Sequence, residues 1–206
     1  MRPTTENRII GPRSRLFLYW TQRSLITVGA LAVSYVVITL LYAKFYQEAA
    51  GHSLDRQIST EVRLGASQPR TVAKEGDLLG RIEIPRLGLT VAVLEGTTSR
   101  TLRLGVGHIR GTAPPGNPGN IGIAGHRDTF FRGLKDIRTG DKIQLQTPTG
   151  LSHYEVDWVQ IVAPSDTAIL SPSTGSAITL VTCYPFHFIG AAPERFAVHA
   201  KEIVAE

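Results

Sequence analysis

The chain has 206 residues, 42% of them hydrophobic and 19% charged, a composition that fits one or two folded domains and excludes an intrinsically disordered protein. Its formal net charge of +5 at pH 7 would suit a nucleic-acid binder if the basic residues covered a folded surface. They gather at the N-terminus instead, where residues 1–23 contain five arginines and one glutamate. The rest of the chain is nearly neutral, so we expect no nucleic-acid partner.

An uncharged apolar stretch, residues 24–43, follows this basic segment. Its length matches the roughly 20 residues that a helix needs to cross a bilayer, which predicts a transmembrane helix. A cleaved signal peptide and a buried core helix are the alternatives; a retained anchor is favoured because the stretch is longer than a signal core and lacks a convincing cleavage site. The arginines before it predict a single-pass protein of the cytoplasmic membrane, with residues 1–23 in the cytoplasm and the chain after the transmembrane segment outside.

The part predicted to be exported divides into a stalk and a domain, which differ in their pattern of polar and apolar residues. Residues 44–77 are polar and weakly periodic, which predicts a linker that is partly helical near the membrane and looser toward Ser67–Pro69. From residue 78, short apolar runs alternate with turn formers, a pattern typical of a mainly β domain that spans residues 78–206. The predicted strands cover residues 80–84, 90–94, 120–124, 142–146, 152–162, 177–182 and 195–200.

Period-two alternation in several of these segments predicts a closed or nearly closed sheet with one solvated face. Two short peripheral helices are expected. One covers residues 98–104 with Thr98 or Ser99 as its cap, and the other covers residues 129–134 after a capping Asp128. Residues 111–120 contain too many turn formers for regular structure, which predicts a shaped loop.

The chain contains one cysteine, Cys183, in the part predicted to be exported. Because cysteines in such compartments are usually paired, an unpaired one is a bland buried residue, an intermolecular bridge or a reactive thiol. Cys183 ends a predicted strand just before Pro185, and His126 lies where another strand leaves the sheet. A thiolate beside an imidazole is a nucleophile with its own acid and base, and Arg195 could stabilise an oxyanion. These residue types predict a Cys-His-Arg acyl-transfer site.

Other histidines could serve as the base, and the residues alone leave this open. The rivals are His108, His153, His187 and His199, and His187 is the most serious because it lies four positions after the cysteine. Asp128 could orient the ring of His126, although the role of helix cap is favoured.

Three motifs carry a family resemblance: TLVTC at residues 179–183, GHRDTFFRGL at 125–134 and APERF at 192–196. Together they resemble the sortases, specifically the class D type, and the match extends over nearly all of residues 80–201. The resemblance implies an eight-stranded sortase β-barrel in which His126, Cys183 and Arg195 are catalytic. It also implies that Thr182 adds a hydrogen bond in the substrate groove.

The activity that the resemblance implies is that of a membrane-anchored cysteine transpeptidase. Such an enzyme would cleave an LPxTG-like C-terminal sorting signal of an exported protein after its threonine and form a thioester on Cys183. An amine from a peptidoglycan precursor or a pilin lysine would then accept the acyl group. The alternatives are a thiol peptidase that only hydrolyses the signal and a non-catalytic anchored peptide-binding domain. No cofactor is expected, and no metal site, because the aspartates are scattered: Asp136, Asp141, Asp157 and Asp166.

Overall fold

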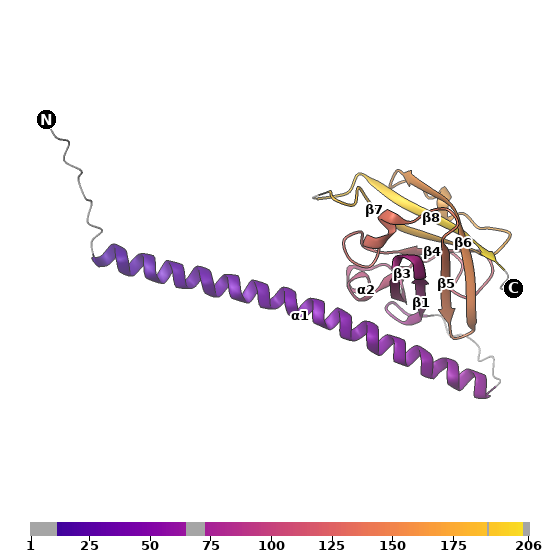
Figure 1. Ribbon diagram of the computed structural model, residues 1–206, viewed down its shortest axis with the longest axis horizontal. Coiled ribbons are helices and arrows are strands. Elements are labelled where there is room, and N and C mark those ends of the chain that lie inside the picture. Colours follow the sequence, from indigo (N-terminus) through magenta and orange to yellow (C-terminus); the bar gives the residue numbers. More distant parts are fainter. Residues whose placement is uncertain (1–11, 65–72, 189, 204–206) are drawn as a thin grey trace. The chain divides into compact units, whose positions relative to one another are not determined.

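The computed structural model describes residues 12–64, 73–188 and 190–203, which form a long N-terminal helix and a β-barrel (Figure 1). The helix, α1 (Pro12–Leu64), begins in a first structural unit that ends at Lys44. The barrel belongs to the second unit, which begins at Phe45.

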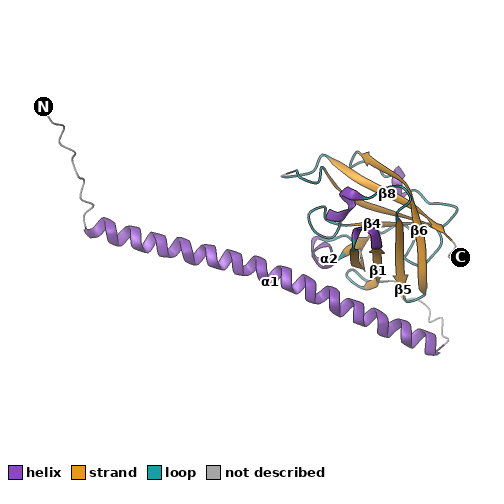
Figure 2. Cartoon of the chain, in the orientation of Figure 1, coloured by secondary structure: helices purple, strands orange, loops and turns teal. Residues whose placement is uncertain are grey.

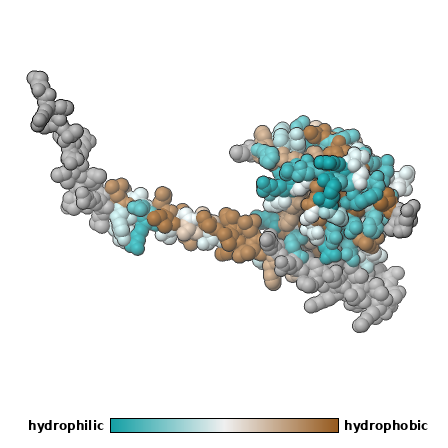
Figure 3. Space-filling view, viewed as in Figure 1, coloured by the Kyte–Doolittle hydropathy of each residue, from teal (hydrophilic) through white to brown (hydrophobic). Residues whose placement is uncertain are grey.

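The apolar part of α1 is long enough to span a membrane. Residues 17–47 form a 31-residue candidate span, which contains the predicted segment 24–43, and none of its most apolar window is buried inside the protein. Figure 3 shows these apolar side chains in brown. Exposing so many apolar groups to water is unfavourable, so the segment suits a lipid environment. Helix α1 continues to Leu64, so the predicted stalk begins as a helix, while the predicted loosening at Ser67–Pro69 lies outside the described residues.

Eight strands in the described residues close into a barrel in the order β1-β2-β3-β4-β7-β8-β6-β5 (Figure 2). The strands are β1 (Leu78–Ile84), β2 (Leu89–Glu95), β3 (Val106–His108), β4 (Asn120–Ala124), β5 (Lys142–Thr147), β6 (Gly150–Val162), β7 (Ala177–Tyr184) and β8 (Glu194–Ile203). The pairs β2·β3 and β4·β7 are parallel, and the others are antiparallel. All seven predicted strands are confirmed, and β3 is an eighth that the sequence pattern did not reveal.

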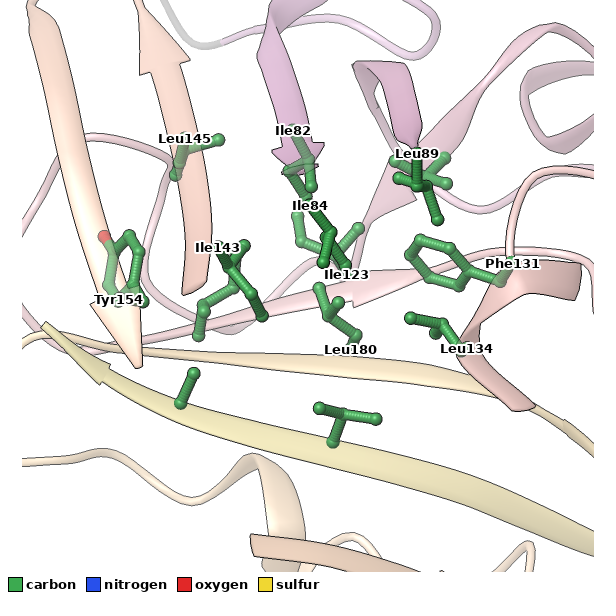
Figure 4. Packing of buried hydrophobic residues seen from close by; sticks show 14 of the residues in the cluster. Ile82, Ile84, Leu89, Ile123, Phe131, Leu134, Ile143, Leu145, Tyr154 and Leu180 are labelled. Atoms are coloured by element: carbon green, nitrogen blue, oxygen red, sulfur yellow. The ribbon is translucent and has the colours of Figure 1, made fainter. Parts of the chain in front are cut away.

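The barrel interior is the hydrophobic core, and alternation along the strands fills it. In β5, Ile143 and Leu145 are fully buried, and in β6 Tyr154 and Val156 are each 1% exposed. Figure 4 shows inward-pointing residues from several strands meeting in one cluster. Because each strand puts alternate side chains inside, the intervening residues face outward.

One of the two predicted helices is confirmed and the other is corrected. Helix α2 (Ser99–Leu104) begins at the cap Thr98, whose side chain accepts a hydrogen bond from the Thr101 amide at 3.3 Å. The helix predicted at residues 129–134 is instead the 3₁₀ helix η2 (Arg132–Asp136). Its cap position is Phe131, without a side-chain hydrogen bond, so the capping role predicted for Asp128 is wrong.

The η2 segment is also not peripheral, because it contributes to the core. Phe131 and Leu134 are fully buried, and Figure 4 shows both pointing toward core residues of the barrel such as Ile123 and Leu180. Turns precede η2 because the chain must bring the Phe131 ring into the barrel within a few residues of leaving β4. This packing fixes the segment that begins with His126.

An ion pair between Arg86 and Asp141 joins two further turns of the barrel. The 3₁₀ helix η1 (Pro85–Leu87) presents Arg86, whose guanidinium donates to both carboxylate oxygens of the buried Asp141 and to the Asp136 carbonyl oxygen. The Arg138 amide also donates to Asp141 at 2.8 Å. The hydrogen bonds from Arg86 lower the pKa of Asp141 below its ordinary value of 3.8, although partial burial opposes them.

We expect the Asp141→Asn substitution to destabilise the barrel by about 1–3 kcal/mol at pH 7, because it removes charge-assisted hydrogen bonds. The folded-state pKa is below the unfolded-state pKa, so the carboxylate stabilises the fold above pH 3.8 and loses this effect as the pH falls through the folded-state pKa. Thermal unfolding by circular dichroism at pH 7 and pH 3 should therefore show a smaller difference between wild type and variant at the lower pH. Asp166→Asn, at an exposed loop position, is the control. An equal penalty at both pH values would contradict this account.

Candidate active site

The parallel pair β4·β7 brings two of the predicted catalytic residues to the same edge of the barrel. Ala124 lies opposite Val181, and the Gly125 amide extends the pairing by donating to the Val181 carbonyl oxygen at 3.1 Å. Ile123 and Leu180 point into the core, so the intervening positions face outward. Two residues beyond the Ala124·Val181 pair lie His126 and Cys183, which the register brings to the same level along the two strands.

Gly125 lets the chain leave β4 against a core ring. A Cβ added at this position would lie 2.6 Å from Cδ2 of Phe131, too close for any side chain without displacing the ring. The Phe131 amide in turn donates to the carbonyl oxygen of His126 at 3.1 Å. The packing of the Phe131 ring against Gly125 and this hydrogen bond from the Phe131 amide together fix the backbone at His126.

Cys183 and Arg195 are direct neighbours across the antiparallel pair β7·β8. Residues directly opposite in such a pair have Cβ atoms about 4.5–5.5 Å apart and share one face of the sheet. The Cys183 thiol is free and half-buried. Nη1 of Arg195 donates to the carbonyl oxygens of Ala192 at 3.2 Å and Glu194 at 2.9 Å, which leaves its other nitrogens for a ligand.

Thr182 points away from the face that carries Cys183. It is 2% exposed, and its hydroxyl donates to the Gly125 carbonyl oxygen at 2.8 Å. The sequence expectation gave Thr182 a hydrogen bond in the substrate groove, whereas the structure uses this hydroxyl inside the protein. The bond joins the residue before the cysteine to the residue before His126.

Aromatic rings pack beside the strand ends that carry the cysteine and the arginine. Phe186 and Phe196 meet edge to face with ring centroids 5.2 Å apart, and Tyr184 lies within about 6 Å of both rings (6.1 and 6.2 Å). Phe186 and Phe196 also pack against the hydrophobic core. This apolar cluster anchors the ends of β7 and β8, so the positions of Cys183 and Arg195 rest on core packing as well as on strand pairing.

Two of the rival histidines have partners of their own. His108 is buried, and its Nδ1 lies 2.8 Å from the Glu95 carboxylate. His199 stacks on Trp158 and contacts Asp157 through Nδ1 at 2.6 Å. His153 lies on β6 opposite Gln144 and Ile203. His187 is exposed in the loop after β7, so strand register does not orient it toward the cysteine as it does His126.

The aspartates considered as metal ligands each have another contact. Asp136 pairs with Lys135, Asp141 with Arg86, and Asp157 with His199 and Lys201, while Asp166 accepts a hydrogen bond from the Ala168 amide. Within the described residues, no group of three or more histidine, cysteine, aspartate or glutamate side chains could hold a metal ion. Independence of metal remains a prediction.

Comparison with known proteins places this geometry in a family. A family model described as the sortase domain matches residues 82–203. The chain is also 34% identical over 165 residues to Sortase D of Bacillus subtilis, an alignment that covers 79% of this chain and 80% of that protein. The chain belongs to the sortase family. Its anticipated likeness to the class D type is confirmed.

Solved sortase structures share the fold. A Sortase D5 transpeptidase of Clostridium perfringens is 28% identical with a TM-score of 0.63, and the match covers 78% of this chain and 98% of that one. A lid mutant of Sortase A from Corynebacterium diphtheriae is 31% identical with a TM-score of 0.59, covering 65% and 74% of the two chains. The expected closed sortase barrel is therefore confirmed.

Sortases are cysteine transpeptidases, so this chain is an enzyme and not merely an anchored binding domain. The family acts on sorting signals and uses amine acceptors in general. The N-terminal apolar helix is consistent with a membrane-anchored sortase. Sequence reasoning did not single out Arg127, which the structure connects to the loop between Cys183 and Arg195.

Proposed function

We propose that this sortase cleaves an LPxTG-like C-terminal sorting signal after its threonine and transfers the acyl group to an amine, with Cys183, His126 and Arg195 as catalytic residues. One observation carries the proposal: the single cysteine of the chain lies directly opposite Arg195 in β8, and the β4·β7 register brings His126 to its level. A cysteine transpeptidase needs a thiol, and this chain offers one.

In the first half-reaction, Sγ of Cys183 attacks the carbonyl carbon of the signal's threonine. The proton of the thiol passes to His126, which gives it to the leaving amine as the carbon–nitrogen bond breaks. Nε and Nη2 of Arg195, which make no hydrogen bond within the described residues, donate to the developing oxyanion or to the substrate backbone. The products are a thioester on Cys183 and the released C-terminal peptide.

In the second half-reaction, an incoming amine attacks the thioester carbonyl. The amine's proton passes through His126 to the sulfur as the carbon–sulfur bond breaks and a new amide bond forms. A peptidoglycan precursor and a pilin lysine both supply such an amine. Water in place of the amine would give the alternative reaction, hydrolysis of the signal.

Thr182 serves this site as a positioning residue, in place of the substrate contact suggested by the motif. Its buried hydroxyl donates to the Gly125 carbonyl oxygen, one residue before His126. Because β7 carries the nucleophile and the end of β4 carries the base, this hydrogen bond supports the spacing between them.

The function is tested by mass spectrometry on the full chain in detergent, incubated with an LPxTG-type peptide with and without a small amine such as triglycine. We expect an acyl adduct on the protein, with the mass of the signal up to its threonine, and a new amide product when the amine is present. A product from water alone, unchanged by the amine, would support a thiol peptidase. No adduct across varied signals would overturn the proposal.

The same proposal places the catalytic domain outside the cytoplasmic membrane, since the arginines of residues 1–23 favour the cytoplasmic side. The single cysteine makes the orientation measurable without engineered sites. A membrane-impermeant maleimide should label Cys183 on intact protoplasts as fully as after lysis. Labelling that requires lysis would reverse the assigned topology.

A further inference from the structure

Arg127, the residue after His126, connects the exit of β4 with the loop that joins β7 to β8. Its Nη2 donates to the carbonyl oxygens of Phe188 at 2.6 Å and Gly190 at 3.2 Å. Its guanidinium also lies over the Phe188 ring, with Cζ 5.9 Å from the centroid. Among the described residues, Arg127 makes the hydrogen bonds that reach this loop from outside the β7–β8 hairpin.

The loop connects two of the proposed catalytic residues. Cys183 lies two positions before Pro185, where the loop begins, and Arg195 is the second residue of β8. Nη1 of Arg195 donates to the Ala192 carbonyl oxygen, two residues from the Gly190 carbonyl oxygen that Arg127 contacts. Movement of the loop would therefore change an acceptor that orients the Arg195 guanidinium.

The guanidinium of Arg127 is oriented by the loop. Its Nη1 is buried and, within the described part of the chain, finds no acceptor. A buried unpaired donor is unfavourable, so the two carbonyl bonds and the ring contact must compensate for it. A lysine at this position would keep the charge but could not reproduce the planar geometry that serves two carbonyls and a ring together.

We infer that Arg127 is a positioning residue of the transpeptidation, which fixes the β7–β8 loop so that Arg195 stays aligned and water is kept from the thioester on Cys183. This inference rests on the proposed function. Strand pairing joins the His126 side of the site to the Cys183 side through β4 and β7, and Arg127 adds a connection beyond the strand ends. Without it, the contacts that remain for the loop among the described residues are ring contacts within its own hairpin and the packing of Phe186 against the core.

The test compares the full-chain Arg127→Met variant with wild type by hydrogen exchange in detergent, which needs no substrate. Loss of a charge-assisted hydrogen bond should make exchange in peptides covering residues 185–193 about tenfold faster or more, with β5 and β6 unchanged. Arg132→Met, an exposed arginine five residues away, is the matched control and should exchange like wild type. Unchanged loop exchange in Arg127→Met would overturn the inference even if the enzyme is inactive.

The second readout is the partition of the thioester between attack by the amine and attack by water. For Arg127→Met we expect the ratio of amide product to hydrolysis product to fall about threefold to tenfold, with an unchanged melting temperature, as expected when a loop that is no longer fixed lets water reach the thioester. Arg127→Lys should lie between wild type and Arg127→Met. A wild-type ratio in Arg127→Met would refute the inference while the adduct on Cys183 still supports the proposed function.

Discussion

Cys183→Ala should form no acyl adduct with a sorting-signal peptide, and its rate of amide product formation should fall by at least about 10⁴-fold, as expected when a covalent nucleophile is removed. The chain has no second thiol that could substitute. The half-buried side chain is small, and main-chain pairing of β7 with β4 and β8 does not depend on it, so the barrel should stay folded. Mass spectrometry of the quenched reaction and a melting curve measure the two expectations.

Thr139→Ala, at an exposed turn outside the proposed site, is the control and should retain full activity. An adduct on Cys183→Ala would mean that another side chain attacks the signal. If Cys183→Ala lost activity only because it unfolded, the melting curve would reveal it, and Cys183→Ser would then replace it as the test.

The fold was predictable wherever the sequence alternates clearly. Strands β5 and β6 contain runs in which buried and less buried positions follow period two, and their predicted bounds differ from the observed ones by at most two residues. Strand β3 was not predicted because it spans only three residues, Val106–His108, with Gly107 at its centre. Three residues cannot display a period, and the pairing of β3 with β2 and β4 creates the strand.

The prediction of a capped helix after β4 was wrong because the local helix-capping pattern competed with core packing. Asp128 followed by a threonine is typical of a helix start, but Phe131 and Leu134 must both reach the core soon after the chain leaves Gly125. Turns followed by a short 3₁₀ helix satisfy that requirement. Local propensity is a weak prior, and here burial overrides it.

Residue type and motif were enough to propose the catalytic residues, but they did not reveal the contacts that support them. Alternation in β7 did contain a usable signal for Thr182, since Leu180 and Thr182 fall on one face and Cys183 on the other. Arg127 gave no comparable signal. Its partners are main-chain carbonyls some 60 residues away, and carbonyls are present at every position of any sequence.

Replacing Arg195 by lysine should lower kcat by about 10²–10³-fold, the usual effect of removing one donor to an oxyanion. Lysine keeps the positive charge, but it cannot donate to the Ala192 and Glu194 carbonyl oxygens and simultaneously present a second nitrogen to the substrate. Because the interaction is strongest in the transition state, kcat and kcat/KM should fall together. Stopped reactions followed by mass spectrometry at several peptide concentrations give both constants.

Arg103→Lys, in the last turn of α2, has an exposed side chain and is the matched control, expected to behave like wild type. A rise in KM with kcat within twofold of wild type would assign Arg195 to ground-state binding of the signal instead of the oxyanion. A kcat defect that also slows attack on a preformed thioester by the amine would extend its role to the second half-reaction. The two half-reactions share the same carbonyl oxygen beside Cys183, so the geometry predicts that both are slowed.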